Sequence, residues 1–279
     1  MTDILANKHN LGEKKVHPLV ELLQWAKYHN IKDIFPLDPD SINAKIDLHM
    51  DDKGITHIPE GIAVFKNLRI LYAKGNKLKS LPKSLSSLAK LEEVDFSHNE
   101  LENIDVLHSI PGLKIINVSN NKLNVISSPI KNNTNLKHFN IANNQIGGFP
   151  DEICYLKRLE VLNANSNQIK ALNKTFNELS MLSSLYLDNN FLEQIDKEVY
   201  RLNKLKLLSV RYNNITRVSG GIDMMHLLET FFLTGNPLQE LPHSIEELTK
   251  LKYLCLKNTN VCESTLSKRL HSISSFDRR

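Results

Sequence analysis

One eleven-residue arrangement of apolar and polar positions recurs along the chain. From Leu182 to Leu192, apolar side chains occupy positions 1, 4, 6 and 11, and an asparagine occupies position 9. Each copy follows the previous one after 23 residues, or once after 22, and the copies begin at Leu68, Leu91, Leu113, Leu136, Leu159, Leu182, Leu205, Leu228 and Leu251. A weaker first copy begins at Lys45. A fixed period of this length predicts a solenoid of about ten repeats.

Positions 3 to 7 of each copy alternate between inward and outward side chains, which is the period of a strand. In one copy, Leu185 and Leu187 point inward, whereas Ser184, Tyr186 and Asp188 point outward. Because the copies repeat in phase, the sequence predicts one short strand in every repeat.

An asparagine follows each predicted strand at position 9 in eight copies, and Thr259 stands there in the last copy. The eight are Asn76, Asn99, Asn121, Asn144, Asn167, Asn190, Asn213 and Asn236. A side-chain amide both donates and accepts hydrogen bonds, so a buried asparagine at a bend can pair with backbone groups of its own and the neighbouring repeat. We therefore interpret these residues as a structural ladder and not as ligand contacts.

The second half of each repeat returns the chain to the start of the next strand. Its apolar residues are three or four positions apart, which predicts a short helix or 3₁₀ turn with one buried side. Prolines open four of these stretches, where their fixed φ suits a first turn: Pro59, Pro82, Pro150 and Pro242. The return after Ile126 carries Pro129 and residues 132–134, Asn-Asn-Thr. We expect this return to be looser than its neighbours.

The repeated spelling, L-P-x-x-I-x-x-L-x-x-L-x-x-L-x-L-x-x-N-x-L over residues 45–262, resembles the intracellular 23-residue class of the leucine-rich repeat family. The resemblance implies an α/β solenoid, a curved horseshoe with a parallel sheet on its concave face and short helices or 3₁₀ turns on its convex face. The class includes Ras-pathway scaffolds and bacterial leucine-rich repeat proteins, some of them effectors injected into host cells. The Lys-, Asn- and Ile-rich composition is more similar to the bacterial group.

The segments on either side of the array, residues 45–262, are expected to close its ends. Residues 1–15 are polar and expected to be mobile, and residues 16–44 form a helical cap opened by Pro18, with Trp25 beside the apolar face. That face consists of Leu19, Leu22, Leu23 and Ala26. Residues 263–279 are expected to form a C-terminal capping helix and tail, with the apolar side of the helix extending to Ile273 and the last five residues frayed.

Composition narrows the range of functions. The formal net charge is only +4, and lysine and arginine are scattered along the chain, which argues against a nucleic-acid-binding surface. The three cysteines form no C-x-x-C pair, so we expect a reducing, cytoplasmic compartment. The first residues show no apolar core of a Sec signal peptide, and no apolar run is long enough for a membrane span. An effector would then reach the host cytosol without a Sec signal.

No catalytic or metal-binding spelling is present. The chain contains no H-E-x-x-H, G-x-S-x-G or G-x-x-x-x-G-K-[ST] motif, and no histidine or cysteine pair has metal-ligand spacing. Some bacterial leucine-rich repeat proteins carry a ubiquitin-ligase domain after the array, but only 17 residues follow residue 262 here. The sequence therefore predicts neither an enzyme nor a bound cofactor.

The outward positions 3, 5, 7 and 8 of the strands define the candidate binding surface. The middle repeats carry small and amide side chains there, whereas the last repeats carry large ones: Tyr186, Leu207, Arg211, Tyr212, Phe232 and Tyr253. Tyrosine and arginine dominate the hot spots of protein interfaces. We therefore expect a monomer that binds another protein here, with a smaller second patch at Ile70 and Tyr72.

Three alternatives stay open. A phosphate or nucleic-acid ligand could use Lys74, Arg211 and Lys257, in which case binding would weaken steeply with salt. An adaptor for an enzyme could act through residues 1–44. The aromatic side chains could also cover one another on a surface that has no ligand.

Overall fold

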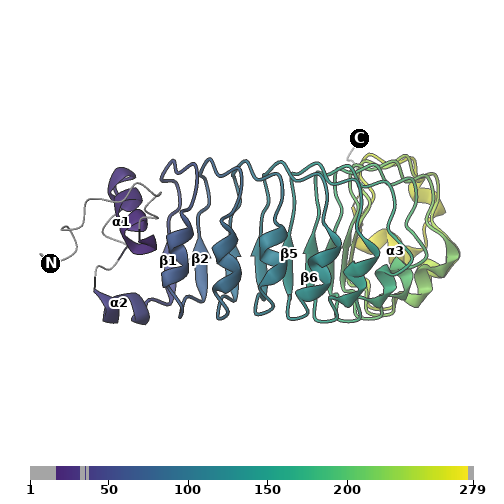
Figure 1. Ribbon diagram of the computed structural model, residues 1–279. Coiled ribbons are helices and arrows are strands. Elements are labelled where there is room, and N and C mark those ends of the chain that lie inside the picture. Colours follow the sequence, from purple (N-terminus) through teal and green to yellow (C-terminus); the bar gives the residue numbers. More distant parts are fainter. Residues whose placement is uncertain (1–16, 32–34, 36–37, 276–279) are drawn as a thin grey trace, which may run out of the picture.

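The chain forms a single parallel sheet that extends along the whole repeat array (Figure 1). The structure, a computed structural model, describes residues 17–31, 35 and 38–275. The predicted mobile segment, residues 1–15, lies outside the described residues. The strands are adjacent in chain order from β1 to β11, as expected for a solenoid in which each repeat contributes one strand.

Each strand is short and pairs with its neighbour in register. The strands are β1 Asp47–His49, β2 Ile70–Tyr72, β3 Glu93–Asp95, β4 Ile115–Asn117, β5 His138–Asn140, β6 Val161–Asn163, β7 Ser184–Tyr186, β8 Leu207–Ser209, β9 Thr230–Phe232, β10 Tyr253–Cys255 and β11 Ser274–Ser275. The inward residue of one strand lies opposite the inward residue of the next, as Leu185 does opposite Leu208. Each repeat position therefore forms a row that crosses the sheet.

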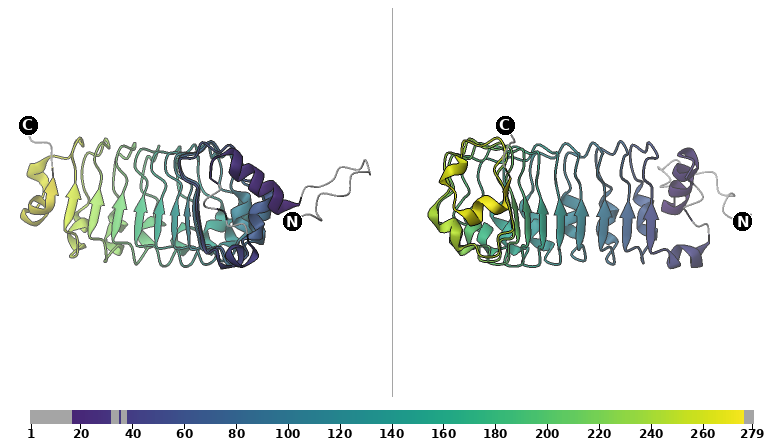
Figure 2. Two further views of the ribbon diagram at one scale, coloured as in Figure 1. Left: turned by 90° about the vertical axis from the view of Figure 1, so that its left-hand side faces the viewer. Right: turned by 180° about the vertical axis from the view of Figure 1, so that it is seen from behind.

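The returning half of each repeat is a 3₁₀ helix. These helices are η2 Glu60–Val64, η3 Lys83–Ser87, η4 Asp105–Ser109, η5 Ser128–Asn132, η6 Asp151–Tyr155, η7 Phe176–Glu178, η8 Val199–Arg201, η9 Gly220–Met224, η10 His243–Glu247 and η11 Glu263–Thr265. The four prolines lie at the residue before the helix, with φ near −70°. The array bends toward the side of the strands, so the sheet lines the concave face and the 3₁₀ helices line the convex face (Figure 2).

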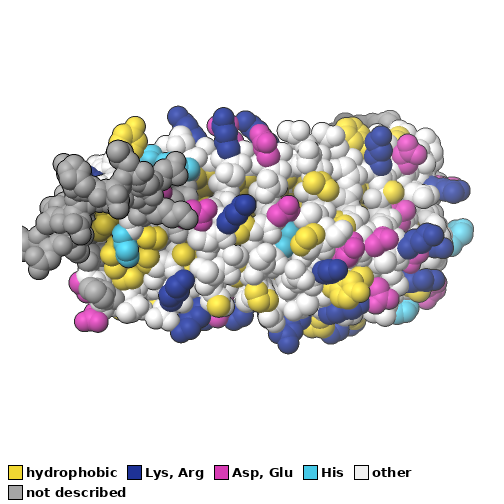
Figure 3. All heavy atoms as spheres, viewed as in Figure 1, with side chains coloured by type: hydrophobic (Ala, Val, Ile, Leu, Met, Phe, Trp, Pro, Cys, Tyr) yellow, Lys and Arg dark blue, Asp and Glu magenta, His cyan; other side chains and the backbone are white. Residues whose placement is uncertain are grey.

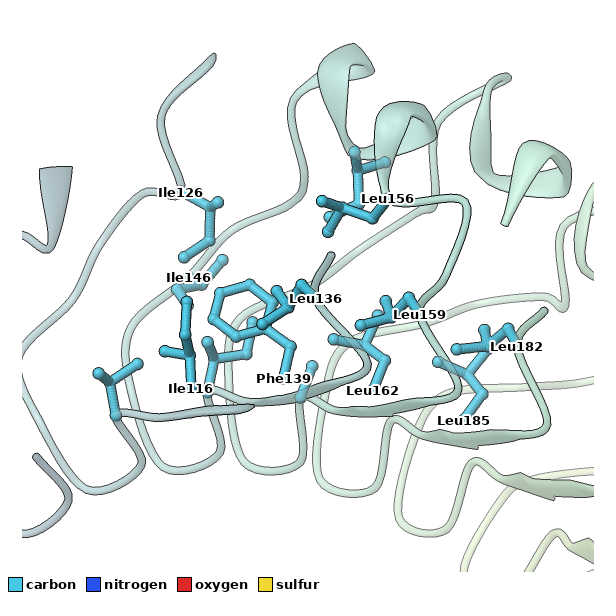
Figure 4. Packing of buried hydrophobic residues seen from close by; sticks show 14 of the residues in the cluster. Ile116, Ile126, Leu136, Phe139, Ile146, Leu156, Leu159, Leu162, Leu182 and Leu185 are labelled. Carbon is cyan, nitrogen blue, oxygen red and sulfur yellow. The ribbon is translucent and has the colours of Figure 1, made fainter. Parts of the chain in front are cut away.

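The core fills the space between the sheet and the 3₁₀ helices. Leu162 and Leu185, the inward residues of neighbouring strands, are fully buried, and so are Leu159 and Leu182 at the first repeat position. Figure 4 shows how these side chains stack from one repeat to the next. Because each repeat buries its apolar atoms mainly against its neighbours, the stability of the fold depends on the contacts between repeats.

The position-9 asparagines bond the backbone at each bend. Asn167 Nδ2 donates to the carbonyl oxygens of Ile141 (3.0 Å), Ala164 (3.1 Å) and Asn165 (3.2 Å), and its Oδ1 accepts from the N–H of Ile146 (3.0 Å). The other seven make the equivalent bonds to the preceding repeat and to their own bend. These bonds pair backbone groups that would otherwise be buried without a partner.

The N-terminal cap consists of α1 Pro18–Tyr28 and α2 Pro39–Ala44. The sequence pattern predicts Trp25 beside the apolar face of α1. In the structure Trp25 belongs to the buried face and packs against Phe35, with ring centroids 5.8 Å apart. Helix α1 lies directly on η2, where a Cβ at Gly61 would be only 2.1 Å from the carbonyl oxygen of Pro18. Only glycine permits this close approach of the cap to the first repeat.

The C-terminal end differs from the prediction. The expected helix is divided into η11 and α3 Lys268–Ile273, and Ser267 caps α3 by accepting a hydrogen bond from Leu270 N–H. The chain then joins the sheet as β11, and the Ser275 carbonyl accepts a hydrogen bond from Leu256 N–H (2.9 Å). The prediction of fraying is therefore wrong for Ser275. Residues 276–279 lie outside the described part of the chain.

The return after Ile126 is not looser than its neighbours, contrary to the prediction. Asn133 is fully buried, and its Oδ1 lies 2.8 Å from Nδ1 of His108 in the preceding repeat. Its Nδ2 donates to the carbonyl oxygens of Leu107 and Ile110, both at 3.1 Å. Hydrogen bonds between repeats thus replace the apolar contact that the other returns make at this position.

Candidate partner-binding surface

The concave face presents the outward rows of the sheet. Along position 5, the register places Tyr186 between Asn163 and Ser209, and Phe232 between Ser209 and Cys255. Residues that are 23 positions apart in the chain are therefore direct neighbours across the strands. In the right-hand view of Figure 2 the strands face the reader.

The structure brings the six C-terminal candidates together on the strands β7 to β10 and the bends that follow them. This set, called the C-terminal patch below, is Tyr186, Leu207, Arg211, Tyr212, Phe232 and Tyr253. Tyr253 and Tyr212 keep 63% and 51% of their surface exposed, and the other four are partly buried. Large aromatic side chains on an open strand face contribute little to a solenoid core and are available to a partner.

Arg211 and Phe232 are in direct contact within the patch. The guanidinium carbon of Arg211 lies 3.9 Å from the centre of the Phe232 ring, within the range of a cation–π contact. Among the described residues, no carboxylate oxygen lies within 4.0 Å of the Arg211 guanidinium, and its buried Nε has no hydrogen-bond partner. The charge is thus held in place by an aromatic ring and is not neutralised by an acidic side chain.

Tyr212 is fixed by the backbone of its own repeat and of the next one. Its φ of 52° lies in the left-handed region, which position 8 adopts in every copy from Asp52 to Asn258. Its ring lies on Gly235, where a Cβ would be 2.4 Å from the ring carbon Cδ1. Gly235 has a φ of 74°, so glycine serves here both the turn and the close approach of the ring.

Cys255 is tied into the end of the sheet. Its sulfur accepts hydrogen bonds from the hydroxyls of Thr234 and Ser275, both at 3.0 Å. Burial raises the pKa of the thiol, whereas these two hydroxyls and the charge of Arg211 lower it. The lowering effects are larger together, so the pKa of Cys255 lies below its ordinary value. Nothing in the sequence indicates that β11 brings Ser275 to this point.

The middle of the concave face uses its polar side chains differently. At position 5 of β3 to β6, a side-chain oxygen accepts a hydrogen bond from the backbone N–H two residues later. These bonds join Asp95 to Ser97 (2.8 Å), Asn117 to Ser119 (3.2 Å), Asn140 to Ala142 (3.2 Å) and Asn163 to Asn165 (3.2 Å). Sequence reasoning missed this role, although the recurrence of Asp or Asn at one outward position was a signal for it.

The smaller N-terminal patch is partly committed to contacts within the array. The hydroxyl of Tyr72 donates a hydrogen bond to Glu93 Oε1, and its ring packs edge-on against His49 with centroids 4.8 Å apart. The hydrogen bond to Glu93, followed by burial, raises the pKa of Tyr72 to about 12. Ile70, on the same strand, is partly buried. This patch offers less unpaired surface than the C-terminal patch.

The three cations of the phosphate alternative do not form one site. Lys74 follows β2, whereas Arg211 follows β8, six strands further along the sheet. At a strand spacing of ~4.8 Å, this separation is roughly 30 Å. Arg211 and Lys257 are only two strands apart. Within the described residues, no cluster of His, Cys, Asp or Glu could hold a metal ion, and no helix is apolar and long enough to cross a bilayer.

Comparison with protein families gives matches along most of the array. The family described as "Leucine rich repeat" matches residues 111–169 and 180–238, and the one described as "Leucine Rich repeats (2 copies)" matches residues 66–109. Together these ranges cover more than half of the chain.

Curated proteins resemble a short part of the chain. An adenylate cyclase of Podospora anserina is 34% identical over 84 residues, which are 29% of this chain and 4% of that protein. Podocan-like protein 1 of Mus musculus is 32% identical over 84 residues, 28% of this chain and 15% of that protein. The chain thus spans only a small fraction of the length of these relatives.

Solved structures resemble nearly all of the chain in fold. LRR protein LIC12759 of Leptospira interrogans covers 86% of this chain and 74% of its own, at 24% identity and a TM-score of 0.57. The LRR chain of FLRT2, in an octameric complex with Latrophilin 3 and Unc5D, covers 87% and 78%, at 19% identity and a TM-score of 0.67. At these identities the likeness concerns the fold alone.

Proposed function

The chain belongs to the leucine-rich repeat family, and from this premise we propose that it binds a partner protein on its concave face, at the C-terminal patch. The observation that carries the proposal is the group of exposed and ordered large side chains at one end of this face. Tyr212 and Tyr253 are more than half exposed, and the Arg211 guanidinium lies on Phe232 without an acidic partner among the described residues. Such anchors are typical of the energetic centre of a protein interface.

The relatives support a role in binding. The LRR chain of FLRT2 is found in a complex with Latrophilin 3 and Unc5D, which shows that a chain of this fold can assemble with other proteins. The adenylate cyclase of Podospora anserina shares only a segment amounting to 4% of its length with this chain. We therefore propose a non-catalytic binding protein that acts as a monomer.

We propose further that the protein works in a reducing compartment, as a scaffold or as a bacterial effector in a host cytosol. Cys154, Cys255 and Cys262 are all free thiols, and Cys262 is exposed to solvent. An exposed thiol is compatible with a reducing environment. Titration of thiols in protein isolated from its native source should find three per chain, and fewer than three would contradict this part of the proposal.

The arrangement gives the other two candidates less support. A nucleic acid would need a continuous basic track. On the concave face, Lys74 lies six strands from Arg211. On the side that carries the 3₁₀ helices, acidic and apolar side chains are interspersed with the basic ones (Figure 3). An adaptor acting through residues 1–44 would depend partly on residues outside the described part of the chain, and it stays a prediction. Deleting residues 1–15 and measuring binding tests it.

The proposal is tested by affinity capture from the native or host cytosol with matched baits. The wild-type chain and a convex control, Lys174→Ala with Glu247→Ala, should retain the same partner. A patch variant, Tyr186→Ala with Tyr253→Ala, should lose it, because both tyrosines lie on the concave face and both control residues are exposed on the returning halves of their repeats. A partner that the convex control loses and the patch variant keeps would contradict the proposed site.

A further inference from the structure

Most of the ion pairs that join repeats lie along one edge of the array, at position 2 of the pattern. There the charges of neighbouring repeats neutralise each other, as Arg69 and Lys114 do on either side of Glu92, each at 2.9 Å. Lys137 pairs in the same way with Glu160 (2.8 Å), and Lys252 with Glu229 (2.6 Å). At these places a cation has an acidic residue of the adjacent repeat as its partner, although most lysines and arginines of the array form no such pair within the described residues.

Arg211 and Lys257 are among the cations without such a partner. Both occupy position 7 on the concave face, and in the described part of the chain neither forms an ion pair. Asp188, which occupies position 7 of the preceding repeat, uses its Oδ1 to accept from the Ser209 hydroxyl (2.5 Å) and from the Arg211 backbone N–H (2.8 Å). The nearest acidic side chain in the row is thus engaged with the backbone and a hydroxyl, and not with the guanidinium.

Between the two cations, the row holds a small and buried side chain. Thr234 lies between Arg211 and Lys257 in the row and is buried, with 7% of its surface exposed. Its hydroxyl donates a hydrogen bond to the Cys255 sulfur, so this hydroxyl proton is not available to a ligand. Two strand spacings separate the backbones of Arg211 and Lys257, which is about 10 Å. An extended chain could place one side chain between the two cations.

We propose that Arg211 and Lys257 form a subsite for a carboxylate side chain of the partner, an aspartate or glutamate in an extended segment whose neighbouring residue is apolar. The Phe232 ring holds the guanidinium carbon at 3.9 Å, so the planar fork of Arg211 is ordered before the ligand arrives. Tyr253 and Tyr212 supply the exposed carbon surface for the apolar neighbour. This subsite rests on the proposed function, because it lies within the C-terminal patch.

The geometry favours a carboxylate over a phosphate group. A phosphate carries nearly two charges and is usually bound by several converging cations and backbone N–H groups. Here one guanidinium is ordered, the second cation is about 10 Å away along the backbone, and the Arg211 N–H is already bonded to Asp188. A single arginine fork matches one carboxylate.

The test uses a displayed library of random twelve-residue peptides, selected on the wild-type chain. Selected peptides should be enriched in aspartate or glutamate next to an apolar residue. The tightest peptide is then synthesised, and its affinity is measured for the wild type, R211Q, R211K and K257Q, with K174Q as the convex control. We expect about a tenfold loss for R211Q, a smaller loss for R211K, which keeps the charge but not the fork, and about threefold for K257Q. K174Q should bind as the wild type does.

A double-mutant cycle identifies the contact. Replacing the peptide's acidic residue by its amide should weaken binding to the wild type but have little further effect on R211Q. Selected peptides without acidic enrichment, or unchanged affinity for R211Q at an unchanged melting temperature, would refute the subsite. Tighter binding of a phosphoserine peptide, or displacement by millimolar inorganic phosphate, would identify a phosphate site instead of a carboxylate site.

The subsite and the wider function can fail separately. If Tyr253→Ala weakens binding of the selected peptide while R211Q does not, the patch binds protein but the carboxylate subsite is wrong. If neither variant changes binding, the peptide binds elsewhere and the proposed function loses its site as well. Should R211Q lower the melting temperature, R211K and the amide-substituted peptide still decide between these outcomes, because the peptide change leaves the fold untouched.

Discussion

The middle and the C-terminal end of the concave face use the same repeat position for different purposes. From β3 to β6, position 5 holds an aspartate or asparagine whose oxygen pairs with the backbone two residues later, as Asn163 does with Asn165. On β7 and β8 this task passes to position 7 of the preceding repeat. Asn165 Oδ1 accepts from the N–H of Asp188 (2.6 Å), and Asp188 Oδ1 accepts from the N–H of Arg211 (2.8 Å). This shift leaves position 5 of β7 available for Tyr186.

An outward side chain in such an array is therefore not available for binding merely because it points outward. The amides of the middle strands support the backbone, and the aromatic residues at the end do not. Both regions rest on the same asparagine ladder.

The largest effect should come from the asparagine ladder beneath both regions. Asn167→Ala removes the partner of the Ile146 N–H and of the carbonyl oxygens of Ile141 and Ala164, all in the interior. At ~1–3 kcal/mol for each buried group left unpaired, the free energy of unfolding should fall by about 3 kcal/mol or more. Denaturant or thermal unfolding measures it. Thr259→Ala, which removes one bond to Leu256, should cost much less, and equal losses would disprove the role of stacked neighbours.

The next effect distinguishes the two regions by binding. Truncating Phe232, Tyr186 or Arg211 to alanine should weaken partner binding by about 2 kcal/mol for at least one of them, roughly thirtyfold in Kd. The melting temperature should change little, because these side chains lie outside the core. Calorimetric titration of the captured partner measures the affinity. Full affinity in all three variants would mean that the aromatic residues only cover one another.

The middle of the face should give the opposite result. Asn117→Ala removes the acceptor of the Ser119 N–H and the donor to Asp95 Oδ2 (2.8 Å). We expect a loss of about 1 kcal/mol in the free energy of unfolding and no change in affinity. Ser184→Ala, a small outward change on β7, is the matched control. Loss of binding without loss of stability in Asn117→Ala would extend the binding surface into the middle of the sheet.

The convex side beneath the middle of the sheet should respond to pH. Burial lowers the pKa of His108 below its ordinary value of about 6.5, although the hydrogen bond to Asn133 opposes this. His108 therefore binds a proton more readily in the unfolded chain than in the folded chain. As a result, the free energy of unfolding should decline as the pH falls below about 6.5. H108Q keeps a polar group but cannot titrate there. Its unfolding free energy should depend less on pH between 7.5 and 5.5, and an unchanged dependence would contradict this assignment.

The sequence was sufficient for the fold because the signal is repeated. The apolar positions and the asparagines recur in phase, so the strand, the bend and the return could be assigned in each copy from one pattern. Structural features that occur only once in the chain could not be predicted in this way. Nothing in Ser274 and Ser275 favours a strand, since their pairing with Leu254 and Cys255 is made by the backbone. The bond between His108 and Asn133 joins positions that only the stacking of repeats makes adjacent.

The candidate site was predictable in part. The repeat pattern placed the six large C-terminal side chains at the outward positions 3, 5, 7 and 8, and in the structure they lie on β7 to β10 and the bends that follow. That they bind a partner stays a prediction. The pattern could not show that Arg211 lies on Phe232, or that the amides of the middle are bonded to the backbone, because both depend on rotamers and on contacts between repeats. The hypothesis of a phosphate or nucleic-acid ligand grouped Lys74 with Arg211 because both are basic residues at an outward repeat position. In the structure the two lie six strands apart along the sheet.

The two-residue strand β11 has a consequence for how copies of this chain meet. Without it, β10 would present unpaired N–H and C=O groups at the end of the sheet, a template for another chain. A truncated form that ends before Ser267 should offer that edge to β1 of a second molecule. Such head-to-tail pairing repeats without closing and leads to filaments. In the intact chain, Ser274 and Ser275 pair with Leu254 and Cys255 and so occupy this edge.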